Sequence, residues 1–277
     1  MSRQPYRFQF LYRPGLYLPD DALQRMVPEL QRVGAECFPE IPDYQCLTGS
    51  REDLMDKVMV VAWRPDGKVA GFCSAMLVKV PDMGHVLHLG LTCVGIDDRG
   101  AGLTHGLTSR LVIRNLLRGN PFRRQWVSNV ACVLSSLGNV ARNFDNVYPS
   151  PYYKDVPSAA HLKIARAIDK NYRPQIYIDD TAQLDEKAFV FRGSVHGTVF
   201  QKDANDTRYH HRNVTLTAWY QRLLNFEQGD EAIQIGHYSW ATLLRYLVRR
   251  GQRPILLPAP PPREALPVGQ QAARVSG

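Results

Sequence analysis

The sequence predicts a mixed α/β (α+β) protein in which helices flank a mostly antiparallel central sheet, with a smaller α+β extension at the C-terminal side. Apolar runs at 58–63, 69–80 and 85–96 are separated by tight turns, which is typical of an antiparallel meander. Segments with helical spacing precede and follow this meander. The chain has 277 residues, of which 44% are hydrophobic and 22% charged, so it can bury a sizeable core.

The first elements are a strand at 7–12, where aromatic and polar residues alternate, and a helix that starts at Asp20 or Asp21 and runs to about Phe38. A shorter helix is predicted near Ser50, because its hydroxyl and the acidic residues after it suit a helix N-terminus. After the three-stranded meander we expect, in order, a helix at 103–118, a strand at 126–134 and a short helix that ends near 143.

The segment 148–153 contains two prolines, and proline interrupts the hydrogen bonding of both helices and strands. We therefore predict that a core domain spans residues 1–153. The extension at 154–253 contains helix-like segments at 159–168, 214–224 and 240–250 and a strand-like segment at 189–200. It is interpreted as a lid or acceptor site. The segment 254–277 is rich in proline and is predicted to be a disordered tail.

Composition excludes several functional classes. No apolar run approaches the roughly 20 residues of a membrane span, and the N-terminus does not resemble a signal peptide, so we expect a cytoplasmic protein without membrane partners. The formal charge of +8 favours anionic ligands, but the basic residues are scattered, which argues against nucleic acid. Five widely spaced cysteines and eight histidines show no zinc spacing, and no metal site is predicted.

A glycine-rich turn, Arg99-Gly100-Ala101-Gly102-Leu103-Thr104, links the third meander strand to the following helix. A turn of this kind leaves backbone N–H groups unpaired at the positive end of the helix dipole. Glycine lets phosphate oxygens approach the main chain and permits positive φ. The turn is therefore a candidate diphosphate site.

Three other interpretations of this turn compete with the diphosphate site. A helix start without a ligand remains open. A P-loop is excluded because the terminal Gly-Lys-Ser/Thr is missing. An NADP-binding Rossmann turn is disfavoured, because it should follow the first strand of a parallel sheet, whereas here an antiparallel meander precedes it.

The order of elements and this turn resemble the GNAT superfamily of CoA-dependent N-acyltransferases over residues 5–150. The family's pyrophosphate loop, Arg/Gln-x-x-Gly-x-Gly/Ala, follows a strand valine by five residues, and Val94 stands five residues before Arg99. Thr104 occupies the position where the family usually has Gly or Ala.

The resemblance implies a set of roles. Backbone amides of Gly100, Ala101, Gly102, Leu103 and Thr104 would hold the pyrophosphate of acetyl-CoA or another acyl-CoA, with Arg99 at the start of the loop. The strand edge at Cys93 and Val94 would pair with pantetheine and polarise the thioester carbonyl. Asn139 is similar to the asparagine that opens the family's later helix and contacts CoA. A wide gap between the strands around Val94 and Trp126 would favour an acyl-CoA site.

The general base and acid are less well defined by the sequence. His88 on the third meander strand is the first candidate base, because imidazole titrates near neutrality; His85 and Asp97 are alternatives. Tyr148 is the candidate for protonating the leaving thiolate, although the family's usual tyrosine context is absent. Cys93 and Cys132 are interpreted as buried structural thiols.

We therefore expect an acyltransferase that moves an acetyl or other acyl group from acyl-CoA to a small-molecule or peptide amine, by direct attack in a ternary complex. An acyl carrier protein is an alternative acyl donor. The competing hypotheses are a catalytically inactive GNAT-shaped binding protein and, below it, an NADP-dependent oxidoreductase.

Overall fold

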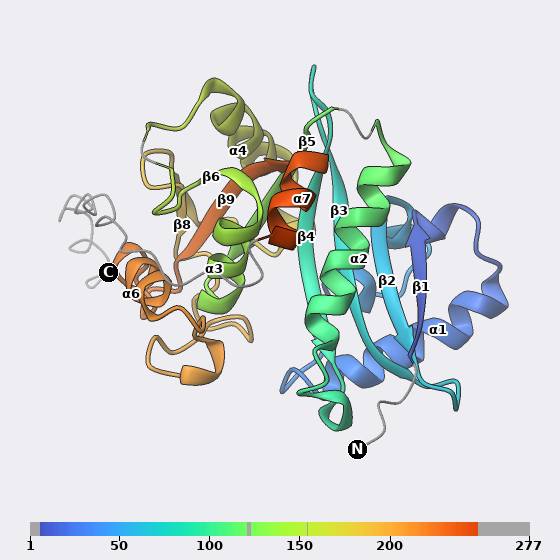
Figure 1. Cartoon of the computed structure of the whole chain (residues 1–277). Helices are drawn as coiled ribbons and strands as arrows, with labels where there is room; N and C mark the ends of the chain where they lie inside the picture. The colour runs from blue at the N-terminus through green and yellow to red at the C-terminus, as the bar shows by residue number, and fades with distance from the viewer. Residues whose placement is uncertain (1–5, 121–122, 154, 249–277) are drawn as a thin grey trace, which may run out of the picture.

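The strands of the chain form a single sheet in the computed structural model, which describes residues 6–120, 123–153 and 155–248 (Figure 1). Within these ranges the strand order is β1-β2-β3-β4-β5-β9-β8-β7, and β6 also pairs with β9. The strands are β1 (Arg7–Tyr12), β2 (Lys57–Trp63), β3 (Val69–Val80), β4 (Gly84–Val94), β5 (Gln125–Ala131), β6 (Asp145–Tyr148), β7 (Gln183–Asp185), β8 (Val190–Arg192) and β9 (Glu231–Tyr238). Every pairing is antiparallel except that of β4 with β5.

The α-helices are α1 (Asp20–Ala35), α2 (Leu103–Arg118), α3 (Leu134–Asn143), α4 (Ala159–Asn171), α5 (Arg173–Ile176), α6 (Val214–Leu223) and α7 (Trp240–Val248). Short 3-10 turns lie at η1 (Pro14–Leu16), η2 (Gln45–Leu47), η3 (Asp53–Asp56), η4 (Ile96–Asp98) and η5 (Thr207–Tyr209). The predicted mixed fold is thus confirmed, and α2 has the bounds expected from the sequence. The helix predicted near Ser50 is wrong, because only the single turn η3 forms there.

Helices cover both faces of the sheet. The side chains of β2 point alternately to the two faces, and their contacts show which helix lies on which face. Met59 and Val61 pack in the same cluster as α1, whereas Val58 and Val60 pack with α2. We call these the α1 face and the α2 face. On the α1 face α4 and α5 also pack, against a cluster that includes Ile233 of β9. On the α2 face lie α3 and α6. Because both faces are covered, β2 is buried almost throughout.

Strand β4 contains a bulge at the point where it leaves β5. Cys73 lies opposite Thr92, and Ala75 lies opposite Leu89, so two residues of β4, Gly90 and Leu91, stand against the single Ser74 of β3. The parallel pairing with β5 ends at Leu89. A β-bulge bends its strand and increases the local twist, which accounts for the divergence of β4 from β5 beyond this residue.

The segment 155–248 completes the same sheet. Strand β9 pairs with β5 along seven residue pairs and with β8 and β6 on its other edge. Sequence analysis did not predict β9 or β6. The strand-like segment at 189–200 is a strand only at β8 and continues as turns. The predicted tail at 254–277 lies outside the described residues.

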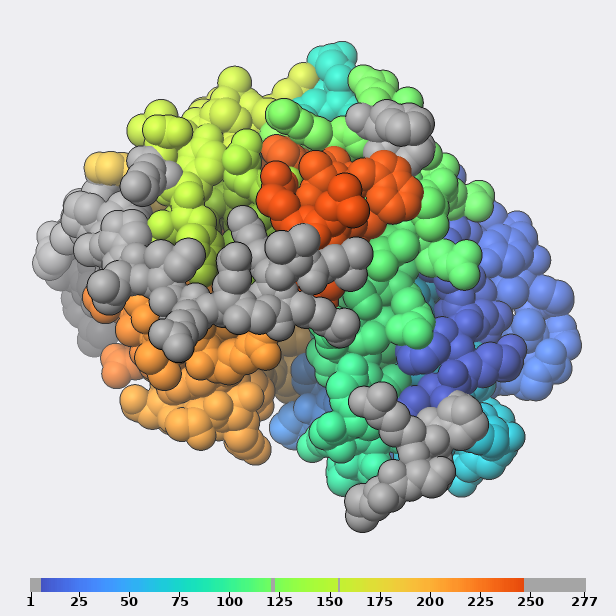
Figure 2. Space-filling view, in the orientation of Figure 1, coloured from blue at the N-terminus to red at the C-terminus, as the bar shows by residue number. Residues whose placement is uncertain are grey.

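Helix α7 packs against the α2 face, between α2 and the segment that carries α3 and β6 (Figure 1). Leu243 contacts the core cluster of α2, and the rings of His105 and Tyr246 stack with their centroids 5.6 Å apart. Figure 2 shows the exposed surface of α7 beside that of α2. None of the helices in the described ranges has the length and apolar character that crossing a bilayer requires.

Candidate acyl-CoA site between β4 and β5

A cavity of about 490 Å³ opens where β4 and β5 part. One wall is formed by β4 from Leu89 to Cys93 and the other by the end of β5 and the residues after it, from Asn129 to Val133. From Gly90 onward β4 has no strand partner on the β5 side among the described residues. Main-chain groups on that edge are therefore available to a ligand. The volume falls in the roughly 300–1,000 Å³ range of small-molecule sites.

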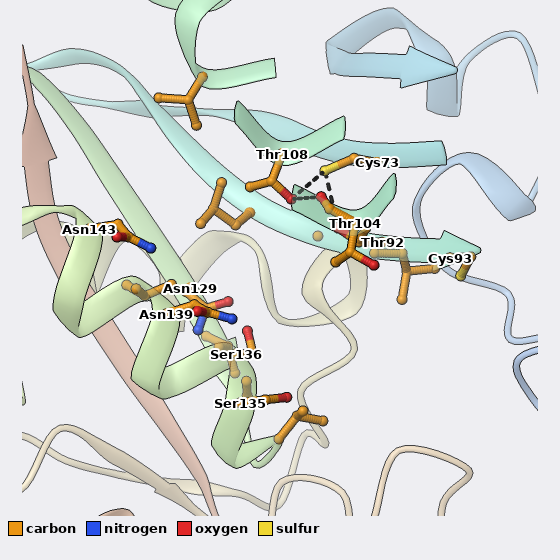
Figure 3. Close-up of a pocket in the computed structure, with 18 of the residues that line it drawn as sticks. Cys73, Thr92, Cys93, Thr104, Thr108, Asn129, Ser135, Ser136, Asn139 and Asn143 are labelled. Atoms are coloured by element: carbon orange, nitrogen blue, oxygen red, sulfur yellow. Dashed lines mark hydrogen bonds between the residues drawn. The ribbon is translucent and has the colours of Figure 1, made fainter. Parts of the chain in front are cut away.

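The α2-face end of the cavity carries several polar side chains. Figure 3 shows Thr104 and Thr108 of α2 on one side and Asn139 and Ser136 of α3 on the other, with Asn129 of β5 on the α3 side. Thr108 donates a hydrogen bond to the carbonyl oxygen of Thr104 at 3.0 Å. Thr242, Leu243 and Tyr246 of α7 complete this end.

The α1-face end is aromatic. Phe38, Tyr44, Tyr177 and Phe200 line it, and they pack edge to face with centroid separations from 4.7 Å (Tyr177 and Phe200) to 6.1 Å (Tyr44 and Tyr177). Because lining residues come from both faces of the sheet, the cavity passes between the strands. Two ligands can therefore approach the same point from opposite sides.

Two side chains of opposite charge line the cavity, Glu231 at the start of β9 and Lys202 in the loop after β8. Glu231 has the same orientation along β9 as Ile233 and Ile235, which places it on the α1 face. Its side chain is buried and accepts a 2.7 Å hydrogen bond from Ser194. Burial raises the pKa of Glu231 to about 7, while Ser194 and Lys202 oppose this rise. Burial also lowers the pKa of Lys202.

The glycine turn lies at the N-terminus of α2, immediately before the cavity-lining Thr104. Gly100 and Gly102 have φ of +80° and +73°, a region that favours glycine, and nothing lies within 4 Å of a Cβ built on either residue. The turn from Arg99 to Gly102 is exposed. The amides of Arg99 and Ala101 donate to the carbonyl oxygens of Ile96 and Asp98 at 3.3 and 3.4 Å, so the turn offers the amides of Gly100 and Gly102 to a ligand. These lie at the positive end of a 16-residue helix.

The start of this turn is anchored at several points. The guanidinium of Arg99 donates a 2.8 Å hydrogen bond to the carbonyl oxygen of Glu36, and the Glu36 carboxylate accepts one of 2.7 Å from the Ile96 amide. Asp98, which is buried, accepts hydrogen bonds from Arg64 Nε at 3.0 Å and from the Tyr6 hydroxyl at 2.8 Å. The start of the turn is thus held against the ends of α1 and β2, while Gly100, Ala101 and Gly102 stay exposed.

The structure brings together most residues predicted to bind the cofactor. Cys93, Thr104 and Asn139 line the cavity, and Val94 directly follows Cys93. Arg99, Gly100, Ala101, Gly102 and Leu103 form the adjoining turn. The gap opens at residues 129–133, at the end of β5 and just after it, and not at Trp126, because the paired part of the two strands ends at Leu89 and Asn129.

The two residues predicted to carry protons lie elsewhere. His88 is fully buried between β4 and β5, with Nδ1 3.0 Å from Ser128 Oγ and no partner for Nε2 among the described residues. Burial lowers its pKa to about 3. The Tyr148 hydroxyl donates to the carbonyl oxygen of Lys187, and burial raises its pKa. Neither residue lines the cavity. The alternatives His85 and Asp97 are exposed.

Sequence reasoning did not identify Glu231, Lys202 or the four rings. A signal for β9 was present, since isoleucines alternate at 233 and 235. Gly90 within an otherwise apolar strand was a signal for the bulge. No local pattern relates the rings, because they come from three separate segments: the loop after α1, the residue after α5 and the loop after β8.

Cys37 and Cys93 both line the cavity, and the Arg99 guanidinium lies 4.0 Å from the Cys37 sulfur. Their thiols interact, and the pKa of Cys37 is lowered to about 6 by this interaction and by Arg99, whereas that of Cys93 is raised. Cys132 is buried with its pKa raised to about 12 by desolvation, and its thiol contacts the Phe200 carbonyl oxygen at 3.2 Å. The described residues include no group of three or more His, Cys, Asp or Glu side chains placed to hold a metal ion.

No protein-family model matches the chain, and no curated protein sequence does either. Solved structures with a similar fold include an acyl-CoA N-acyltransferase from Pseudomonas aeruginosa, at 20% identity over 53% of this chain and 93% of that one, with a TM-score of 0.37. ElaA of Escherichia coli gives 17% identity over the same shares, also with a TM-score of 0.37. The GNAT-family N-acetyltransferase YhbS of Escherichia coli, solved in complex with CoA, gives 17% identity over 47% of this chain and 66% of that one, with a TM-score of 0.32. The similarity to each of these structures extends over about half of this chain.

Proposed function

We propose that the chain is an acyltransferase that uses acetyl-CoA or another acyl-CoA to acylate an amine. One observation carries the proposal: a cavity between diverging parallel strands adjoins an open glycine turn at a helix N-terminus. The turn suits a diphosphate, and the unpaired strand edge suits the amide groups of a pantetheine arm. No dinucleotide-type parallel sheet is present among the described strands, which disfavours the oxidoreductase hypothesis.

The pyrophosphate would bind the amides of Gly100 and of residues 102–104, and the pantetheine arm would run past Asn139 and Thr108 into the cavity. The thioester would reach the β4 edge near the bulge, where a main-chain N–H of the Gly90–Val94 segment can stabilise the negative charge that develops on its oxygen. An amine that enters from the α1 face would meet the thioester directly. This arrangement suits direct attack in a ternary complex.

Calorimetric titration with acetyl-CoA tests the proposal on three proteins: the wild type, Gly102→Glu and Gly67→Glu. Gly67 lies in the β2–β3 turn with φ of +85° and has open space around it, as Gly102 has, so both substitutions impose similar backbone strain and the same charge. We expect the wild type and Gly67→Glu to bind equally, and Gly102→Glu to lose at least about tenfold in affinity through repulsion of the phosphates. Absence of binding by the wild type would exclude acyl-CoA and favour the binding-protein hypothesis.

A further inference from the structure

The α1-face end of the cavity holds a carboxylate that has no role in the proposed binding of acyl-CoA. Glu231 is only 6% exposed, yet no ion pair joins it to a basic side chain among the described residues. Its carboxylate accepts a hydrogen bond from the Ser194 hydroxyl. A buried carboxylate without a paired cation is costly unless it changes its protonation state. Such a group is suited to exchanging a proton with a ligand.

The surroundings of Glu231 define what such a ligand can be. Four aromatic rings, those of Phe38, Tyr44, Tyr177 and Phe200, line this end of the cavity, together with the apolar Ile176 and Val195. Lys202 is the other charged side chain at this end; its Nζ donates to the Val199 carbonyl oxygen and lies 5.3 Å from the centroid of Tyr209. The titratable groups that face Glu231 from neighbouring elements are Lys202, Tyr44 and Cys132.

We propose that Glu231 is the general base of the acyl transfer and that the rings around it hold the acceptor, a primary amine on an aromatic or apolar body. This inference rests on the proposed acyl-CoA function. It places the base on β9, in the segment that follows the predicted core, and not on the meander strand that carries His88.

The proposed step balances as follows. The ionised Glu231 accepts one proton from the ammonium form of the acceptor, which leaves a neutral carboxylic acid and a neutral amine. The amine nitrogen attacks the thioester carbon; the C–N bond forms and the C–S bond breaks. The second proton of the nitrogen passes to the departing thiolate, giving an amide and the free thiol of CoA. Glu231 then releases its proton to water. The first proton transfer converts two buried charges into two neutral groups, which the apolar surroundings favour.

A carboxylate with a pKa of about 7 accepts a proton at neutral pH far more readily than one with the ordinary value of 4.5. The rate should therefore rise with pH as Glu231 ionises and should level off above neutrality. Because the positive charge of Lys202 lowers the pKa of Glu231, loss of that charge should move the rise to higher pH. A residue with a purely structural role would not produce this shift.

The test measures release of CoA thiol from acetyl-CoA with phenethylamine and tyramine as acceptors, between pH 5.5 and 9. We expect the wild type to acetylate at least one of them, and Glu231→Gln to lose about 10²- to 10⁴-fold in kcat/KM. Glutamine keeps an oxygen that can accept from Ser194, so acetyl-CoA affinity, measured by calorimetry, should stay within threefold of the wild type. Lys202→Met should move the acid limb of the pH profile, the range in which the rate rises with pH, to higher pH.

Each other outcome has a defined meaning. The role of Glu231 would be overturned if Glu231→Gln had the same kcat/KM as the wild type. It would also be overturned if the rate of Lys202→Met rose over the same pH range as that of the wild type. If the wild type binds acetyl-CoA but acetylates neither amine, the acceptor class is wrong. If the wild type does not bind acetyl-CoA at all, the proposed function itself fails, and the calorimetric control distinguishes this result from the others. If Glu231→Gln does not fold, the pH dependence of the rate of Lys202→Met is sufficient to test the role of Glu231.

Discussion

Leu89 lies opposite Asn129 in the last parallel pair that joins β4 to β5, and beyond this pair the two strands become opposite walls of one cavity. The bulge at Gly90 and Leu91 comes directly after it on β4. On the β5 side, Asn129 is held by the side chain of Gln234, whose oxygen accepts its hydrogen bond at 3.1 Å. The end of β5 is thus fixed to β9, while β4 turns away.

The buried carboxylate of Asp98 should anchor the glycine turn. Asp98→Ala would leave the guanidinium of Arg64, which is largely buried, without its main partner, and we expect a loss of about 3–5 kcal/mol in the free energy of unfolding. Asp97→Ala is the matched control. Its carboxylate is exposed and 3.5 Å from the same guanidinium, so the loss should stay below about 1 kcal/mol. Urea unfolding measures both, and equal losses would contradict the anchoring role.

Asn139 should contribute to cofactor affinity without dominating it. Its amide lines the α2-face end of the cavity, so we expect Asn139→Ala to weaken acetyl-CoA binding about three- to tenfold, the effect of losing one hydrogen bond. Asn171→Ala, at the end of α4 and away from the cavity, serves as the control. Calorimetry compares the two variants. An unchanged affinity in Asn139→Ala would remove this residue from the site.

Cys37 should be the most reactive thiol of the described chain. Its pKa is lowered to about 6, whereas burial raises the pKa of Cys46 and of Cys132 to about 12. At pH 7 a brief treatment with iodoacetamide should therefore label Cys37 first, because the thiolate is the reactive form. Peptide mass spectrometry identifies the site, and Cys37→Ser should abolish the fast phase.

Since Cys37 lines the cavity, bound acetyl-CoA should slow its alkylation. Addition of ATP, which lacks the pantetheine arm, provides the comparison. Equal labelling of all cysteines would contradict the lowered pKa. Labelling of Cys37 that acetyl-CoA does not affect would place the bound cofactor elsewhere.

The sequence predicted the half of the fold in which local signals are strong. Turn residues separate the meander strands, and the glycine turn marks the start of α2 at Leu103, as observed. The helix near Ser50 was wrong because a good N-terminal residue does not make a helix when the following segment is too short to form one. Strand β8 was predicted too long, since Gly193 and Gly197, with φ of +73° and +71°, turn the chain after Arg192.

The residues of the candidate site also differ in whether a local sequence pattern predicts them. The turn and the β4 edge could be predicted because phosphate binding depends on a local arrangement of glycine, strand and helix. Glu231 could not, because its proximity to the end of β5 follows from the pairing of β9 across roughly a hundred residues. His88 was the expected base because of its ordinary pKa, but the pairing of β4 with β5 buries it.

The burial of His88 has a consequence for stability. The folded protein keeps this imidazole neutral down to about pH 3, whereas an unfolded chain protonates it near pH 6.5. Between these values the unfolded state binds more protons, so the free energy of unfolding should fall as the pH falls, by about 1.4 kcal/mol per pH unit from this residue.

His88→Gln removes this titration, so its stability should depend less steeply on pH than that of the wild type between pH 6 and pH 4. His85→Gln is the matched control for the substitution itself, because His85 lies on the same strand but is exposed. Urea unfolding at pH 7, 6, 5 and 4 measures the slopes. An identical slope in His88→Gln would mean that His88 is protonated in the folded state. In that case water would reach this part of the β4–β5 interface, and His88 would again be a candidate base.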